Sequence, residues 1–462
     1  MAKTNDLLTR LKRYFGVPVD AASLVFLRVC FGLILFWEVT RYFDRGWIAK
    51  YWIEPEFNFH YFGFGWVHPW PGDGMYWHFA GMGILSLLIA FGLFYRLAAW
   101  LMFFAFTYVY LLEQARYLNH FYLVCLIAFL MALSPANVMG SLDVRWGFRK
   151  RKESIARWYL WLLRFQIGAV YFFGGVAKLN GDWLMGEPLR TWLAARADFP
   201  LVGPWLEREW VVGMMNYGGM LFDLLIVPTL LWSRTRALGF AGVIFFNLTN
   251  ATLFTIGIFP FLAISLSTVF FDPSWPRRVF VFRRSTAHVS EDSGMPVGSL
   301  SPMVSRSVVV FLCFYVAWQL FLPLRHWLYP GNVSWTEEGH DYAWHMKLRT
   351  KSSRILFVVR ERDGGKAITV RPSKYLESWQ ASKMANRPDM ILQFATFLSG
   401  KMREEGWKDF GIFVETSVSL NGRARQPLID PGVDLLLQKR SLWPKDWLVP
   451  LQTPLPVRDG GR

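Results

Sequence analysis

The chain has 462 residues, of which 53% are apolar and 18% aromatic. Soluble proteins of this length seldom carry so much apolar surface, so the composition argues against a purely soluble chain. The formal net charge of +16 would suggest nucleic acid in a soluble protein. A membrane protein instead collects basic residues in its cytoplasmic loops, so no nucleic acid is expected as a partner.

Several apolar segments are long enough to cross a membrane, because a helix needs about 20 residues to span roughly 30 Å of hydrocarbon. We expect eight or nine such helices, in the segments 21–40, 75–95, 97–113, 119–136, 157–176, 211–232, 237–253, 256–271 and 305–323. No small-residue cleavage site follows the first segment, which we interpret as a retained helix rather than a signal peptide. The sequence therefore predicts a polytopic α-helical membrane protein.

Basic residues are concentrated in alternate loops between these segments. The densest groups are Arg10, Lys12, Arg13, Arg149, Lys150, Arg151, Lys152, Arg277 and Arg278. The positive-inside rule then places the N-terminus in the cytoplasm and, with nine spans, the C-terminal domain outside it. The run at 145–157 is also suited to anionic lipid, but topology already accounts for it. The expected location is a membrane, most simply a bacterial inner membrane, with a periplasmic or lumenal C-terminal domain.

The chain divides into a transmembrane domain (1–284), a polar linker (285–304), a last transmembrane helix (305–325) and an extracytoplasmic domain (326–462). Strand patterns at 355–359, 367–370 and 413–420, a helix near 386–405 and a turn at Asn421-Gly422 predict a small β-rich α+β domain. The cysteines Cys30, Cys125 and Cys313 fall inside spans, so no disulfide framework is indicated. An interfacial aromatic belt is expected at Tyr51, Trp52, Trp66, Trp70 and Trp205.

Polar residues in or near the spans mark the candidate site, because charge in the membrane is seldom kept without a partner or a use. They are Arg28, Arg164, Asn119, His120, Lys178, Asp182, Asp223, Asn247 and Asn250. The topology puts His120, Lys178, Asn250 and His326 on the outer side, where they could line one cavity. Arg28 and Arg164 are expected to pair with buried polar partners such as Asp223 rather than to contact a substrate.

Lys178 follows the apolar run 170–177, where desolvation favours the neutral amine, and a neutral amine can act as a base. The alternative is a lysine that extends its ammonium group into water. His120 is either catalytic or a structural histidine at a helix end, and Asn119 either a site residue or a helix cap. HExxH, CxxC, Walker, Rossmann and GxSxG patterns are missing from the sequence, so no metal, nucleotide or serine nucleophile is expected.

Six stretches carry a resemblance that extends over nearly the whole chain. They are VDAASL at 19–24, LNHFYL at 118–123, VYFFGGVAKLNGDW at 170–183, NATLFTIGIF at 250–259, YAWHM at 342–346 and DPGVD at 430–434. In these stretches the chain resembles the vitamin K-dependent gamma-carboxylase family. The resemblance implies an enzyme that oxygenates reduced vitamin K to an epoxide, uses the strong base so formed to remove a γ-proton from a glutamate, and adds CO2.

The resemblance also assigns residues. Lys178 matches the base that deprotonates the hydroquinone, and His120 matches a histidine that assists at the quinone-derived alkoxide. Positions expected to bind the quinone are Asn119, Asn250, Phe254, Phe259, Trp344 and Met346. His326 matches a family histidine of structural or site role, and Arg164 is a further candidate of either kind. The implied reactants are reduced vitamin K, O2 and CO2 without a metal, and the implied partners are the lipid bilayer, the quinol and an exported protein or peptide bearing glutamates.

The chain also departs from the animal members of this family. Ala177 replaces a lysine, Asn247 stands where they have a histidine, their structural disulfide is missing, and they extend beyond the position that matches residue 462. These differences predict a short, bacterial type of member with altered peptide handling. Two other functions stay open: a quinol epoxidase or oxidoreductase that does not carboxylate protein, and a non-enzymatic membrane scaffold or transporter.

Overall fold

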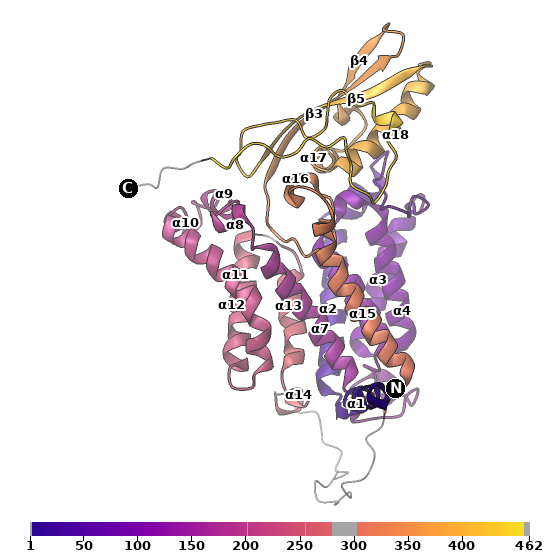
Figure 1. Cartoon of the computed structure of the whole chain (residues 1–462). Helices are drawn as coiled ribbons and strands as arrows, with labels where there is room; N and C mark the ends of the chain where they lie inside the picture. The colour runs from indigo at the N-terminus through magenta and orange to yellow at the C-terminus, as the bar shows by residue number, and fades with distance from the viewer. Residues whose placement is uncertain (1, 201, 255, 280–302, 457–462) are drawn as a thin grey trace, which may run out of the picture.

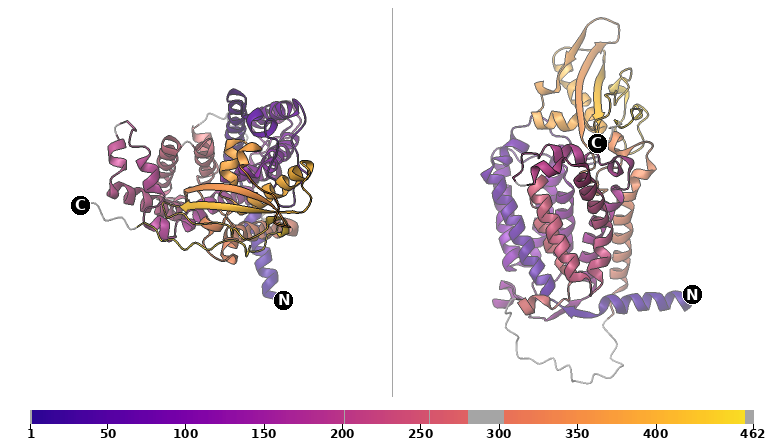
Figure 2. Two further views of the ribbon diagram at one scale, coloured as in Figure 1. Left: turned by 90° about the horizontal axis from the view of Figure 1, so that it is seen from above. Right: turned by 90° about the vertical axis from the view of Figure 1, so that its left-hand side faces the viewer.

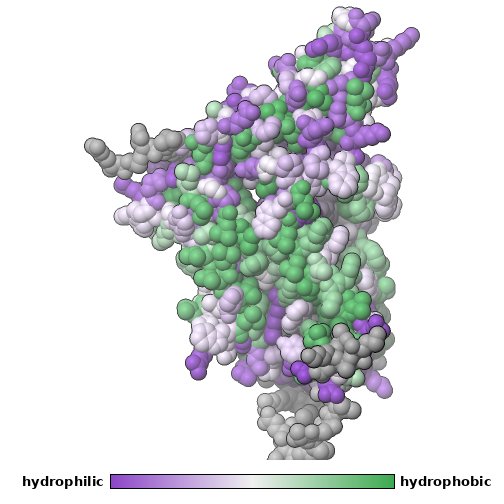
Figure 3. All heavy atoms as spheres, viewed as in Figure 1, coloured by the Kyte–Doolittle hydropathy of each residue, from purple (hydrophilic) through white to green (hydrophobic). Residues whose placement is uncertain are grey.

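The computed structural model describes residues 2–200, 202–254, 256–279 and 303–456, and shows a helical bundle with a smaller domain at one end (Figure 1). The predicted linker at 285–304 lies outside the described residues except for its last two. On the face shown in Figure 3, apolar side chains form a band across the middle of the bundle, and polar side chains gather toward both ends. This distribution is the one expected of a protein that spans a bilayer.

Among the described residues, seven helices are long and apolar enough to cross a membrane. They are α2 (Ala22–Asp44), α3 (Gly74–Phe91), α4 (Tyr95–Leu112), α7 (Trp158–Ala177), α11 (Glu209–Leu231), α12 (Arg236–Phe254) and α15 (Arg306–Leu324). The predicted spans 119–136 and 256–271 correspond to shorter helices, α5 (Asn119–Leu133) and α13 (Phe259–Ser267). Each predicted span therefore contains an apolar helix, and the two short ones bury most of their residues against neighbouring helices.

Shorter elements connect the long helices. They are α1 (Ala2–Gly16), β1 (Pro18–Asp20), a π-helix (Ala49–Ile53), α6 (Leu142–Arg145), β2 (Ser154–Ala156), α8 (Gly181–Leu184), α9 (Leu189–Ala194), α10 (Gly203–Leu206), α14 (Trp275–Val279), and 3-10 turns at Gln114–Arg116, Thr268–Phe270 and Arg325–Leu328. Helix α1 runs roughly at right angles to the long helices and projects outward from the end of the bundle opposite the C-terminal domain (Figure 2). Next to it β1 pairs with β2, and Arg277 binds Asp20 at 2.7 Å.

The C-terminal domain is built on a three-stranded antiparallel sheet in the order β4-β3-β5. Its elements are α16 (Val333–Thr336), β3 (Lys351–Glu361), β4 (Ala367–Val370), α17 (Ser378–Met384), α18 (Pro388–Glu404), β5 (Phe410–Leu420), and 3-10 turns at Pro372–Lys374 and Leu435–Leu437. Phe357 of β3 and Phe394 of α18 are fully buried where the helix covers the sheet. The predicted small α+β domain is confirmed, with β3 and β5 longer than expected.

The predicted turn after β5 is also confirmed. Asn421 and Gly422 both have positive φ, at 51° and 80°, as a two-residue type I′ turn requires. The amide of Arg423 donates to the carbonyl of Leu420 at 3.1 Å, which closes the turn.

The predicted aromatic belt is only partly correct. Trp66, Trp70 and Trp205 are exposed, whereas Tyr51 and Trp52 are buried. Trp52 packs against Tyr42 and Phe79 inside the bundle. Residue type alone does not separate an interfacial aromatic from a core aromatic, because both positions accommodate a large ring. The three cysteines are free thiols.

Candidate functional site

Lys178 is buried at the capped end of the bundle, by which we mean the end that carries the C-terminal domain. It directly follows α7, and only 8% of its side chain is exposed. Its ammonium group donates to the carbonyl of Gly174 at 3.2 Å and pairs with the carboxylate of Asp223 from α11. The ring of Trp183 lies 5.4 Å from the nitrogen. The alternative of a lysine that extends its ammonium group into water is therefore wrong for Lys178.

Asp223 binds Lys178 and is not the partner of either arginine. Arg28 and Arg164 were expected to pair with polar groups, and both do, but their acceptors are backbone carbonyls rather than Asp223. Arg28 donates to Ala136 at 3.0 Å and to Gly140 at 2.6 Å. Arg164 donates to Val269 at 2.6 Å and to Phe271 at 3.2 Å. Carbonyls that follow helix ends lack helical donors and readily accept from a guanidinium group, so neither arginine needs a carboxylate.

Two glycines bring α11 against the lysine. A Cβ added to Gly175 would lie 2.7 Å from a side-chain carbon of Leu224, which is too close for any side chain. A Cβ on Gly174 would lie 3.4 Å from the Asp223 carboxylate. Small residues let membrane helices approach closely. Gly174 and Gly175 therefore have a packing role. They let α11 approach closely enough to place the carboxylate of Asp223 beside the ammonium group of Lys178.

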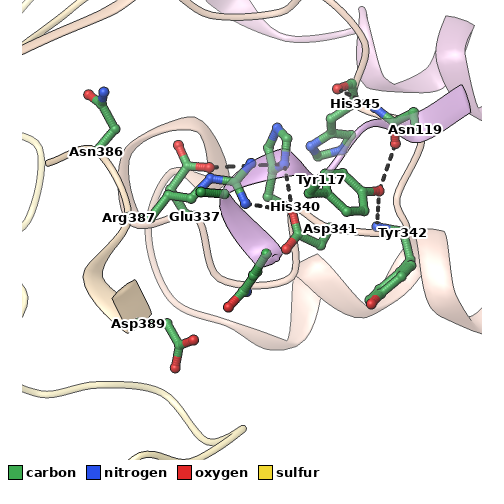
Figure 4. A network of polar contacts seen from close by, with 12 residues as sticks. Tyr117, Asn119, Glu337, His340, Asp341, Tyr342, His345, Asn386, Arg387 and Asp389 are labelled. Carbon is green, nitrogen blue, oxygen red and sulfur yellow. Dashed lines mark hydrogen bonds and ion pairs between the residues drawn. The ribbon is translucent and has the colours of Figure 1, made fainter. Parts of the chain in front are cut away.

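Residues 342–347 of the C-terminal domain, which we name the capping segment, cover this end of the bundle. The hydroxyl of Tyr117 accepts from the amide of Tyr342 at 2.6 Å and donates to the side-chain oxygen of Asn119 at 2.8 Å (Figure 4). The Asn119 amide group donates to the carbonyl of His345 at 3.1 Å. Asn119 thus fixes the start of α5 to the capping segment.

The same segment also packs near the end of α7, the helix that Lys178 follows. The ring of Trp344 is fully buried and packs on Tyr122 with centroids 5.2 Å apart. The terminal methyl of Met346 lies 3.3 Å from the place a Cβ on Gly174 would take, on the side of Gly174 that faces the Asp223 carboxylate. The capping segment therefore contacts both the start of α5 and the end of α7.

The backbone of the capping segment is strained. Tyr342, Trp344 and Lys347 have φ values of 67°, 58° and 54°. Residues with a side chain rarely adopt this left-handed region, at a cost of roughly 1–3 kcal/mol each. Packing and hydrogen bonds around the segment must offset that cost. Strain of this kind is concentrated at binding and catalytic sites.

His120 lies on α5, in a different immediate environment from Lys178. Its ring is 4.8 Å from that of Phe121 and 6.3 Å from that of Phe259. A Cβ on Gly257 would lie 3.8 Å from Nε2 of His120 and 3.6 Å from the Arg41 guanidinium group. These are ordinary contact distances, but Gly257 also has a φ of +65°, so a side chain there would be strained. The adjacent Asn119 connects this region to the capping segment.

The remaining predicted site residues are spread more widely. Phe254 ends α12 beneath Lys347, with the lysine nitrogen 5.6 Å from its ring. Asn250 lies one turn earlier on α12, half-buried. His326 follows α15, and its ring is 4.7 Å from that of His345. Arg164 lies 14 positions before Lys178 on α7, about 20 Å away by helical rise, and its contacts are structural.

The junction with the C-terminal domain includes a buried ion pair that sequence patterns did not reveal. Asp182 accepts from both terminal nitrogens of Arg423 at 2.6 Å and from the Asn421 amide group at 2.7 Å. Asn421 and Arg423 belong to the turn after β5, and Asp182 lies four residues beyond Lys178. The turn was recognisable in the sequence, but its partner in the membrane domain was not.

A charged network lies beside the capping segment within the C-terminal domain (Figure 4). Arg349 binds Glu337 and His340, and Arg387 binds Asp341 at 3.4 Å. The ring of His340 lies 5.2 Å from that of His345. Burial lowers the pKa of His340 to about 4 and holds the pKa of His345 well below its usual range. Both rings are therefore neutral at physiological pH.

This burial predicts that the C-terminal domain loses stability in acid. Between about pH 6.5 and pH 4 an unfolded chain binds a proton at His340 that the folded chain does not, so stability falls as pH falls through that window. The full loss from His340 is about 3 kcal/mol. Thermal unfolding of the purified protein at about pH 7.5 and about pH 5 measures the part of this loss that falls between the two pH values. His340→Asn should show a smaller difference between the two conditions, and an unchanged difference would contradict this origin.

The fold and the site define an integral membrane protein whose C-terminal α+β domain closes a buried lysine–carboxylate site. Residues 17–275 match the HTTM domain, and residues 304–454 match the lumenal domain of vitamin K-dependent gamma-carboxylase. The chain belongs to the vitamin K-dependent gamma-carboxylase family. Membership indicates a carboxylase that uses vitamin K, O2 and CO2. No solved structure matches the chain significantly.

Proposed function

We propose that the chain carboxylates glutamate residues with reduced vitamin K, and that Lys178 takes the proton of the hydroquinone hydroxyl. The observation that carries this proposal is the buried Lys178–Asp223 pair at the capped end of the bundle. In a site of low dielectric constant, an ammonium–carboxylate pair can pass one proton internally to become an amine and a carboxylic acid. The amine then accepts the hydroquinone proton, and Asp223 retains the first one.

Oxidation must supply the driving force for the later step. Side-chain bases have pKa values between roughly 4 and 10, far too low to deprotonate a carbon next to a carboxylate. In the proposed reaction, reduced vitamin K, O2, CO2 and a glutamate give the vitamin K epoxide, water and γ-carboxyglutamate. Oxygenation of the quinol supplies the strong base that removes the γ-proton. The protein holds the reactants together and keeps water away from the base.

The described contacts suit Trp344 and His345 of the capping segment to holding the quinol. Nε1 of Trp344 and Nδ1 of His345 are buried without a hydrogen-bond partner among the described residues. Buried polar atoms of this kind usually have a partner, and a quinol oxygen would provide one. We assign Trp344, Met346, Phe254 and Phe259 to apolar walls. Asn119 and Asn250 would supply polar contacts, and His120 would assist at the oxygen that becomes negatively charged.

The proposed orientation places the N-terminus in the cytoplasm and the C-terminal domain in the periplasm or lumen. It is supported by the match of residues 304–454 to a lumenal domain and by the basic loops at the opposite end of the bundle. An exported protein or peptide bearing glutamates would then reach the site from the capped end. A bacterial inner membrane fits this arrangement.

Purified protein in detergent, given reduced vitamin K, O2, labelled bicarbonate and a glutamate-rich peptide, tests the proposal. We expect both vitamin K epoxide and label fixed in the peptide. Epoxide without fixed label would support a quinol epoxidase that acts without protein carboxylation. Neither product from folded protein would contradict the enzymatic proposal and favour a scaffold or transporter.

A further inference from the structure

A second group of cationic and aromatic side chains lies beside the Lys178 site. The nitrogen of Lys347 is 5.1 Å from the centroid of Trp192 on α9 and 5.6 Å from that of Phe254 at the end of α12. Arg196, which follows α9, is close enough to lower the pKa of Lys347, although burial lowers it more. In the described parts of the chain neither cation forms an ion pair with an Asp or Glu. The group therefore presents uncompensated positive charge.

The position of Lys347 connects this charge to the proposed chemistry. Lys347 directly follows Met346, the residue whose methyl group packs on Gly174 near Asp223. Consecutive Cα atoms are only about 3.8 Å apart. The constrained backbone of Lys347, with φ at 54°, and the two aromatic faces hold its side chain over α9 and α12. Lys347 is exposed, and its contacts with the two rings keep its positive charge at the edge of the Lys178 site.

We propose that Lys347, supported by Arg196, Trp192 and Phe254, binds the side-chain carboxylate of the glutamate that is carboxylated. This inference rests on the proposed function and names the residues that select its acceptor. The acceptor arrives with one negative charge, and removal of its γ-proton adds a second. A fixed cation beside the carboxylate stabilises that second charge more than the first, so it favours both binding and proton removal. The aromatic faces of Trp192 and Phe254 orient the ammonium group.

The test compares Lys347→Glu with wild type in two assays on the full-length protein. The first measures binding of a fluorescent glutamate-rich peptide, with a glutamine-rich peptide of the same length for comparison. The second measures the KM for the glutamate peptide in fixation of labelled bicarbonate, beside epoxide formed without any peptide. Lys366→Glu is the matched control, because Lys366 also lies over a tryptophan, Trp407 at 4.6 Å, but between β3 and β4.

We expect Lys347→Glu to weaken glutamate-peptide binding and to raise the KM at least about tenfold, the effect of losing roughly 1.4 kcal/mol of binding. Epoxide formed without peptide should change less than about twofold, Lys347→Arg should restore most of the binding, and Lys366→Glu should resemble wild type. Equal peptide affinity in wild type and Lys347→Glu would overturn the inference. Binding that depends on Lys347 in a wild-type protein without turnover would support the inference and overturn only the carboxylase proposal.

Discussion

Lys178→Arg is expected to abolish epoxide formation and CO2 fixation while the protein stays folded. Arginine keeps a positive charge next to Asp223, so the buried pair is preserved. A guanidinium group does not lose its proton in proteins, so the variant has no amine that could act as a base. Losing a general base costs about 10²- to 10⁴-fold in rate. The measurement is the initial rate of epoxide formation, with thermal unfolding as the check on folding.

The arginine variant separates chemistry from stability better than alanine does. Lys178→Ala leaves the carboxylate of Asp223 buried without a partner, which costs roughly 3–5 kcal/mol, so inactivity of that variant would have two explanations. Lys178→Met combined with Asp223→Asn removes both charges and should be inactive but more stable than Lys178→Ala. Lys50→Arg, at an exposed position, is the control. An active Lys178→Arg enzyme would exclude Lys178 as the base.

The membrane fold was largely predictable from the sequence, because lipid imposes a simple rule. A segment that crosses hydrocarbon needs about 20 apolar residues, and each predicted span contains an apolar helix. The rule does not report which spans are shortened. Helices α5 and α13 are shorter because loops and 3-10 turns at their ends are covered by protein rather than lipid, and buried irregular backbone is tolerated at that depth.

The partners inside the site were not predictable in the same way. Lys178 and Asp223 are 45 positions apart, and only the approach of α11 to Gly174 and Gly175 brings them together. The two glycines were a usable signal for close packing, but not for which residue would fill the space. Arginine has many acceptors among backbone carbonyls, which is why the polar partners expected for Arg28 and Arg164 are carbonyls and not the carboxylate of Asp223.

The contacts and backbone conformation of the capping segment could not be predicted from residue patterns. The resemblance pointed to Trp344 and Met346, but not to the contacts that place them. Left-handed backbone is usually signalled by glycine, and here Tyr342, Trp344 and Lys347 adopt it instead. Tertiary contacts such as the hydrogen bond from Asn119 to the His345 carbonyl impose this conformation. Local sequence does not encode such contacts, so neither the left-handed conformation of the segment nor the position of Lys347 was expected.

Asp182→Ala is expected to loosen the C-terminal domain from the bundle and to lower the stability of the junction by roughly 3–5 kcal/mol. The substitution leaves Arg423 buried without its carboxylate and removes the acceptor of Asn421. Hydrogen exchange of the turn after β5, together with thermal unfolding, measures the change. Glu405→Ala breaks an exposed pair with Lys374 and should cost less than about 1 kcal/mol.

Asp182→Ala also tests whether turnover requires the C-terminal domain to be held against the bundle. Asp182 does not contact Lys178 through any described hydrogen bond, so a loss of turnover would arise from movement of the C-terminal domain and its capping segment. Asp182→Leu combined with Arg423→Met removes both charges and should recover part of the stability, because an apolar pair can replace a buried ion pair. If the double variant regains stability and turnover together, the junction acts by holding the cap in place. If stability returns without turnover, Asp182 has a more direct part in the reaction.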